Sequence, residues 1–306
     1  MNVREWALPV YTILMQMAVG ALFVLWVIRW RAGSKYKPGE IDRIIRNPIL
    51  VIVVTAAVAM TASHFHLSRP FQSYMAVFNF KTSWLSREIV FTGLFFGMLL
   101  SLLYLTYFGD KRRNLITALG WLAILTGSIL IYCMARIYLL PTQVAWNSTS
   151  VIVSFYVTAL TLGAMALACL LLLDLKFAEI QKSGDIELRA QLIKSSLAGL
   201  SAAAILLALI SIAITYLQMY LLGQGGLIAR TSLKLILDLY LPLLVMRQVL
   251  LISAVIFLGV AVYRMFRLNL MPQNMLVPVY LSCLLILVGE IVGRFLFYAT
   301  HIRVGL

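Results

Sequence analysis

The amino-acid sequence predicts an all-α, polytopic membrane protein built as an eight-helix transmembrane bundle. Of its 306 residues, 62% are hydrophobic and 12% are charged, whereas soluble domains are closer to half apolar and a quarter charged. Apolar runs of about 20 residues, the length that crosses a bilayer as a helix, recur along the whole chain. No polar stretch is long enough to bury a core of its own, so we expect residues 1–306 to form a single integral membrane domain.

Eight apolar runs define the predicted helices. The first follows Trp6 and the third follows Trp84, and both rings suit the interface between bilayer and water. The second leads to His64 and His66, and Pro70 disfavours a helix soon after them. In chain order the predicted spans are 7–28, 47–67, 88–108, 115–140, 149–173, 196–222, 241–265 and 275–300.

The second half of the chain follows the same plan. Trp146 precedes the fifth span and Tyr240 precedes the seventh, again as interfacial anchors. Two connections on the same side of the membrane, 68–87 and 223–240, are long. We therefore expect a docking surface on that side.

The distribution of basic residues predicts the orientation. Loops after the first, third, fifth and seventh spans contain 15 Lys and Arg residues, and the opposite side contains 7. Because basic loops stay on the cytoplasmic side, both termini are expected outside a cytoplasmic (inner) membrane. This asymmetry explains the net charge of +14. We therefore expect contacts with membrane lipids and no nucleic-acid partner. The N-terminal tail also lacks the basic region and cleavage site of a signal peptide.

Polar residues within the predicted spans gather in the outer half of the membrane. The inner half offers no ionisable residue before Asp174 and the basic loops. A proton or ion pathway needs polar groups through the whole thickness, whereas a ligand with a polar head and an apolar tail needs only an outer pocket. The candidate pocket residues are Gln16, His64, His66, Glu88, Arg136, Tyr138, Arg247, Glu290, Arg294 and His301.

A quinol is a ligand of this kind, because it has a long apolar tail and two hydroxyls that lose protons on oxidation. Histidine accepts a proton near neutral pH, so His66 is the predicted acceptor. Glu88, across the connection between the second and third spans, would orient this histidine or pass the proton to water. His64 lies about 200° around the helix from His66, so the two do not easily share one site.

Bound metal is not expected in this chain. Its three cysteines, Cys133, Cys169 and Cys283, stand singly in apolar runs without a CxxC spacing, which excludes the usual cluster and zinc motifs. Haem b between His301 and one of the other two histidines is an alternative. It is disfavoured because haem-binding membrane subunits usually carry paired histidines well inside their spans.

The last span contains the densest set of polar residues. Glu290, Arg294, Tyr298 and His301 fall on one stripe of the helix, and the first two have the spacing of an i,i+4 ion pair. Small residues four apart, which let two helices approach closely, occur at Gly289 and Gly293 and again at Gly93 and Gly97.

These residues resemble a known family, the membrane-anchor subunit of anaerobic dimethyl sulfoxide reductase. The resemblance runs from the first span to the last, and its C-terminal motif is the most specific part. This sequence departs from relatives at Phe65 and Ser68-Arg69, beside the histidine. The matching elements are Glu5-Trp6 with Thr12, Gln16 and Gly20; His66-Leu67 with Pro70; Glu88-Ile89; Met134-x-Arg136-x-Tyr138; Arg247; and Gly289-Glu290-x-x-Gly293-Arg294-x-x-Phe297-Tyr298-x-x-His301-x-x-Val304-Gly305.

The resemblance implies eight helices with both ends outside and a haem-free subunit that binds menaquinol near the outer face. It also implies that electrons pass to an iron–sulfur, ferredoxin-like subunit and then to a molybdopterin catalytic subunit, both docked on the outer face. The iron–sulfur clusters and molybdenum cofactor would lie on those partners. Within the family, the positions that match His66 and Glu88 are associated with the quinol site.

Three other readings remain open. The same type of anchor serves enzymes acting on other sulfur compounds or oxyanions, some of which run in the quinone-reducing direction. A transporter is possible for a polytopic protein of this size, but it would need discontinuous helices and a site near the midplane. The third reading is a purely structural anchor whose partner subunit binds the quinol.

Overall fold

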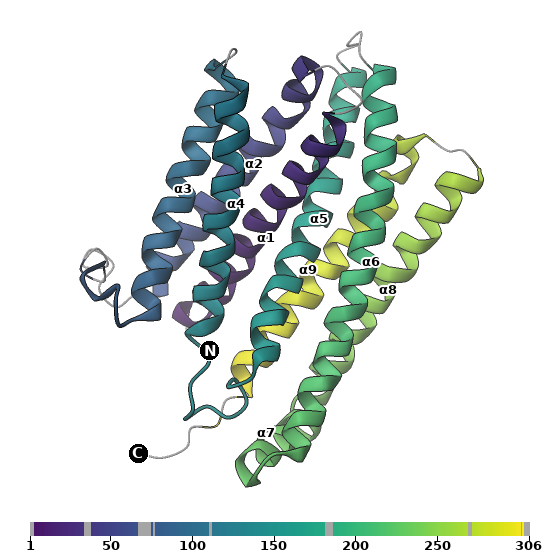
Figure 1. Cartoon of the computed structure of the whole chain (residues 1–306). Helices are drawn as coiled ribbons and strands as arrows, with labels where there is room; N and C mark the ends of the chain where they lie inside the picture. The colour runs from purple at the N-terminus through teal and green to yellow at the C-terminus, as the bar shows by residue number, and fades with distance from the viewer. Residues whose placement is uncertain are drawn as a thin grey trace.

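Figure 1 shows the computed structural model of the chain. It describes residues 3–33, 38–66, 75, 77–109, 112–180, 186–268, 271–300 and 302. For residues 3–5, 38–40, 42, 43, 66 and 186–189 it describes the backbone alone.

The described residues fold into helices without any strand, as the composition predicts. Eight of the helices are long and apolar enough to cross a membrane, which confirms the predicted number of spans. In chain order the elements are α1 (Val3–Ala32), α2 (Pro38–His66), α3 (Trp84–Phe108), α4 (Arg113–Arg136), α5 (Thr149–Ile180), α6 (Ile186–Gln224), α7 (Leu227–Asp238), α8 (Leu241–Arg267), the 3-10 turn η2 (Pro272–Met275) and α9 (Leu276–Ala299).

The two ends of the bundle differ in composition. We call the end where α1 begins and α9 ends the termini end, and the opposite end the basic end (Figure 1). Helix ends at the basic end carry arginines, among them Arg29, Arg31, Arg264 and Arg267. The structure places the start of α1 and the end of α9 at one end of the bundle, while the prediction that this end faces the outer side of the membrane stays a prediction.

Helices α1 and α5 form the centre of the bundle. Their most apolar windows are 67% and 72% buried, compared with 33–44% for the other six spans. The two helices cross where Gly20 meets Gly163, and the backbones touch there. A Cβ atom on Gly20 would lie 1.8 Å from the Ala159 carbonyl oxygen, so only glycine fits at this crossing. Close packing through small residues is the usual way in which membrane helices associate.

The remaining helices pack around this centre in pairs. Helices α3 and α4 form one pair and α8 and α9 form another, while α2 packs on α1 and α3, and α6 packs on α5 and α8. Helix α9 also contacts both α1 and α5. The termini end of α9 therefore lies against the central helices (Figure 1).

Glycine faces in the structure only partly match those predicted. Gly289 and Gly293 do face a neighbouring helix, because Cβ atoms there would meet Leu251 and Arg247 of α8. The prediction for Gly93 and Gly97 is wrong within the described residues, since a Cβ on either would meet nothing within 4 Å. These two glycines leave α3 with a smooth outer surface instead of a helix–helix contact.

The connection 223–240 contains a short helix. Helix α7 has 12 residues and lies at the termini end between α6 and α8 (Figure 1). Ala229 and Ser232 are its buried residues, while Leu227 and Leu239 beside its ends are exposed. A search for long apolar runs misses it because it has only 12 residues and its apolar residues are interleaved with Arg230 and Lys234.

Candidate functional site

Buried polar side chains gather in the half of the bundle nearer the termini end, on two faces of α1. Tyr11 faces α3, where its hydroxyl lies 2.9 Å from the Thr92 hydroxyl. Gln16 faces α9, where its Oε1 accepts a hydrogen bond from the Arg294 guanidinium at 2.9 Å. Because these residues are about 140° apart around one helix, α1 separates two polar sites.

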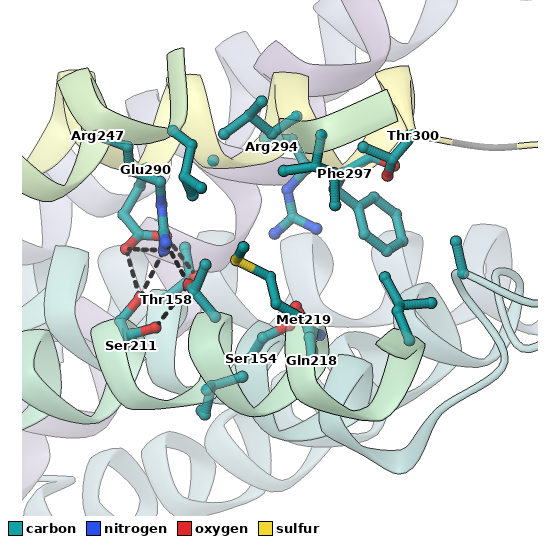
Figure 2. Close-up of a pocket in the computed structure, with 18 residues that line it drawn as sticks. Ser154, Thr158, Ser211, Gln218, Met219, Arg247, Glu290, Arg294, Phe297 and Thr300 are labelled. Carbon is teal, nitrogen blue, oxygen red and sulfur yellow. Dashed lines mark hydrogen bonds and ion pairs between the residues drawn. The ribbon is translucent and has the colours of Figure 1, made fainter. Parts of the chain in front are cut away.

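The first site is a cavity of about 110 Å³ bounded by α5, α6, α8 and α9 (Figure 2). Polar groups line its inner part and apolar groups line the part toward α7. Among the predicted pocket residues, Arg247, Glu290 and Arg294 line this cavity directly. The apolar lining includes Met219, Leu222, Ile236 and Leu244.

A buried ion pair holds one wall of this cavity. The Glu290 carboxylate lies 3.4 Å from the Arg247 guanidinium, and Figure 2 shows the two groups side by side. Glu290 also accepts hydrogen bonds from the Thr158 hydroxyl at 2.8 Å and the Ser211 hydroxyl at 2.9 Å. Arg247 in turn donates to Ser211 at 2.8 Å and to Thr215. Charge and hydrogen-bonding capacity of the carboxylate are thus met by the protein.

This arrangement corrects the predicted pairing within the last span. Glu290 pairs with Arg247 on α8 instead of Arg294 one turn along α9. Gly293 makes room for this contact, because a Cβ there would lie 2.4 Å from the Arg247 Nε atom. An i,i+4 spacing permits a local pair, but the rotation of α9 against α8 decides the partner.

Arg294 lies one turn along α9 from Glu290, also lines the cavity, and links it to α1. Its guanidinium lies 3.9 Å from the centre of the Phe155 ring, in a cation–π contact, and it donates to Gln16. Figure 2 shows this guanidinium directed into the cavity, between the Glu290 pair and Phe297. Gln16 is completely buried, and its hydrogen bond with Arg294 joins α1 to α9 inside the bundle.

Several hydroxyl and amide side chains of this site were not predicted. A lone Ser or Thr in an apolar span usually bonds its own helix, as Thr106 does with the Leu102 carbonyl. The available signal was their helical spacing, which places each set on one face of a helix. The residues are Ser154 and Thr158 on α5 and Ser211, Thr215 and Gln218 on α6.

An aromatic cluster covers the cavity at the termini end. The Tyr138 hydroxyl lies 2.7 Å from the Tyr298 hydroxyl, and the Trp146 Nε1 donates to the Phe297 carbonyl at 2.7 Å. The rings of Trp146 and Phe297 stack with centroids 5.2 Å apart. Tyr138 thus lies beside the cavity residues and bonds another tyrosine of the protein, while its predicted contact with a quinol stays a prediction.

The second site surrounds Glu88 on α3. This carboxyl is buried and interacts with the Tyr11 hydroxyl of α1, which also bonds Thr92. Within the described residues, no salt bridge to Glu88 is present. Its surroundings therefore differ from those of Glu290, which has a guanidinium in contact.

Arg136 belongs to neither group of hydrogen bonds. Its guanidinium lies 5.0 Å from the centre of the Trp84 ring, and that of Arg87 lies 4.1 Å from the same ring. Arg87 additionally donates to the Phe80 and Lys81 carbonyls. The three side chains form a cationic and aromatic surface at the termini ends of α3 and α4.

The three histidines are placed less completely. His66 is the last residue of α2, at the same end as Glu88 near the start of neighbouring α3, but its side chain lies outside the described part of the structure. His301 also lies outside the described residues. His64 is exposed, shares a hydrogen bond with the Met60 carbonyl at 2.8 Å, and borders a hollow of about 360 Å³ with Phe65 and Phe96.

Comparison with known proteins gives consistent matches along the sequence. A family model described as "DMSO reductase anchor subunit (DmsC)" matches residues 1–300. The "Anaerobic dimethyl sulfoxide reductase chain YnfH" of Escherichia coli (strain K12) is 26% identical over 305 residues, which cover 99% of this protein and 97% of the relative. An anaerobic dimethyl sulfoxide reductase subunit of Haemophilus influenzae is 26% identical over 183 residues, which cover 59% of this protein and 64% of the relative.

Proposed function

This chain belongs to the DMSO reductase anchor-subunit family, and from that premise we propose that it oxidises a membrane quinol, menaquinol, near the termini end. The electrons taken from the quinol then pass to an iron–sulfur partner subunit and on to a catalytic subunit. The chain is a multi-pass membrane anchor, and quinol oxidation is the chemistry that its buried polar groups suit.

The observation that carries the proposal is the one-sided distribution of these groups. Glu88, Arg247, Glu290 and Arg294 all lie in the half of the bundle nearer the termini end. Near the basic end, buried Asp174 accepts a hydrogen bond from Asn47 at 2.8 Å. A ligand that reaches its site sideways from the bilayer needs polar groups at one depth only, whereas a transport path needs them throughout.

We place the quinol head at the termini ends of α2 and α3. The hollow between Phe65 and Phe96 has an apolar lining apart from His64 and Thr61, which suits the first part of an isoprenoid tail. The head would then reach the ends of the two helices, where His66 and Glu88 lie. Compared with the cavity of about 110 Å³ beside Glu290, this position gives access from the bilayer without passing between packed helices.

The proposed chemistry releases two protons and two electrons from each quinol. His66 takes the first proton from a quinol hydroxyl. Glu88 orients His66 or relays both protons, one after the other, toward water. The electrons leave for the iron–sulfur subunit as the quinol becomes a quinone. Arg136 and His301 are further candidates for contacts with the head. Arg247, Glu290, Arg294, Gln16 and Tyr138, which the sequence also suggested for this pocket, gather on the other side of α1, so we leave them out of the head-group contacts.

The test is His66→Ala in the complete enzyme complex. Quinol-driven turnover should fall at least ~100-fold, as expected when a general base is removed. Reduction of the terminal substrate by an artificial donor that reaches the partner subunits directly should stay unchanged, and the partner subunits should still copurify. Tyr263→Ala, an exposed ring on α8 near the basic end, serves as the control.

Normal quinol turnover in His66→Ala would remove this residue from the mechanism. Photolabelling of the complex with a quinone analogue, mapped by mass spectrometry, then distinguishes the readings. Labels at the termini ends of α2 and α3 support the proposal. Labels confined to a partner subunit would instead make this protein a structural anchor.

A further inference from the structure

The basic end contains a groove that the proposed quinol site does not use. It lies between α1 and α6, has a volume of about 850 Å³, and forms where α1 ends and α6 begins (Figure 1). Helix α6 lines it with small residues at helical spacing, Ser195, Gly199 and Ala203. A Cβ on Gly199 would meet nothing within 4 Å, so the groove floor is open beside this residue.

The lining changes from apolar to polar toward the basic end. Phe23 and Val27 of α1 and Leu200 of α6 form its deeper walls, about one to two helical turns inside the polar part. Arg31 and Gln191 line the part nearest the helix ends. An occupant must therefore combine an apolar chain with a polar head, which excludes a free inorganic anion as the sole ligand.

The charge of the lining identifies the class of head group. Among the described residues that line the groove, Arg31 is the only charged side chain, and it is exposed. Trp30 beside it is 71% exposed, as an indole at the lipid head-group level should be. A cation with hydrogen-bonding neighbours at the membrane surface matches a negatively charged phosphate.

We propose that this groove binds one anionic phospholipid of the adjoining leaflet. One acyl chain lies along α1 and α6 beside Gly199, and the head group faces Arg31, Ser195 and Gln191. The lipid fills the space that the small residues of α6 leave open next to the central helix α1. This site is independent of the quinol chemistry, because it lies at the opposite end of the bundle.

The groove is tested by Gly199→Leu, which places a side chain in the acyl-chain position. The matched control is Gly259→Leu on α8, where a Cβ also meets nothing within 4 Å and which does not line the groove. Purified complex is equilibrated with phosphatidylglycerol and washed in detergent, and retained lipid is counted by native mass spectrometry. We expect one retained phosphatidylglycerol per anchor in the wild type and the control, and at least ~10-fold less in Gly199→Leu.

The head-group assignment is tested by Arg31→Gln against Arg267→Gln, an exposed arginine at the same end. Each variant is offered phosphatidylglycerol and phosphatidylcholine in competition. The preference for the anionic lipid should fall about fivefold in Arg31→Gln and stay unchanged in Arg267→Gln. Equal lipid retention in the two leucine variants would overturn the proposal. So would an unchanged preference in Arg31→Gln, or a quinone in place of the phospholipid at this stoichiometry.

Discussion

Two buried carboxyl groups in this bundle have opposite environments. Glu290 lies against the Arg247 guanidinium and accepts hydrogen bonds from Thr158 and Ser211. Glu88 interacts with the Tyr11 hydroxyl, without a salt bridge among the described residues. Both are almost fully enclosed, so burial alone does not distinguish them.

The difference indicates which carboxyl can exchange a proton. Protonating Glu290 would leave Arg247 as an uncompensated buried charge, which is strongly unfavourable in a low-dielectric interior. Protonating Glu88 leaves no such cation behind. We therefore assign Glu290 to the scaffold that holds α5, α6, α8 and α9 together, and we propose that Glu88 is the carboxyl that takes part in the proposed quinol oxidation.

The largest expected effect is on turnover in Glu88→Gln. The amide keeps the size of the side chain and one acceptor oxygen but cannot take a proton, so quinol-driven turnover should fall ~100-fold or more. Copurification of the partner subunits and activity with an artificial donor should persist. Glu179→Gln, an exposed carboxyl that bonds Gln273, is the matched control, and full activity in Glu88→Gln would contradict the assignment.

Glu290→Gln should reduce stability instead of chemistry. Leaving Arg247 buried without its counter-charge costs about 3 kcal/mol, measured as a lower midpoint of thermal unfolding and a lower yield of assembled complex. Adding Arg247→Met should recover much of this loss, because the second change removes the unpaired charge. A stable Glu290→Gln complex that cannot oxidise quinol would reverse the roles of the two carboxyls.

The smallest expected effect is that of Tyr11→Phe. Losing the hydroxyl removes its contacts with Thr92 and Glu88, and one hydrogen bond is worth about 1 kcal/mol. The unfolding midpoint should therefore fall by only a few degrees. Quinol-driven turnover should drop about fivefold, because Glu88 loses the hydroxyl that positions it. Thr12→Val, which loses a bond to the Pro9 carbonyl of the same helix and a contact with Tyr298, gives a reference for altering α1 without touching Glu88.

Much of the fold was predictable because span length and hydropathy are local properties. Each of the eight apolar runs became a helix, and the 12-residue α7 escaped because its apolar residues are interleaved with Arg230 and Lys234. Packing was less predictable, since the sequence does not show how each helix is rotated. Gly93 and Gly97 have the spacing of a contact face but meet nothing, whereas Gly20 and Gly163 form the tightest crossing.

The residue types of the candidate site and their depth in the membrane were predictable. The division of these residues into two sites on different faces of α1 was not. Arg247, Glu290, Arg294 and Gln16 were recognised as polar residues in one half of the membrane, and the structure brings these four together. Glu88 had the same signal, yet it lies across α1 from them. Whether two buried polar residues share a site depends on which faces of α1 they approach, and this follows only from the assembled bundle.

The contact between Gly20 and Gly163 also limits how the anchor can move. Helices that change position in membrane proteins commonly slide or roll against each other by small shear steps. Two backbones that touch without intervening side chains leave no room for such sliding. Helices α1 and α5 are therefore expected to move together as one rigid unit. Flexing in response to an arriving or departing ligand is then left to the outer helices, with α2 and α3 nearest the proposed entrance.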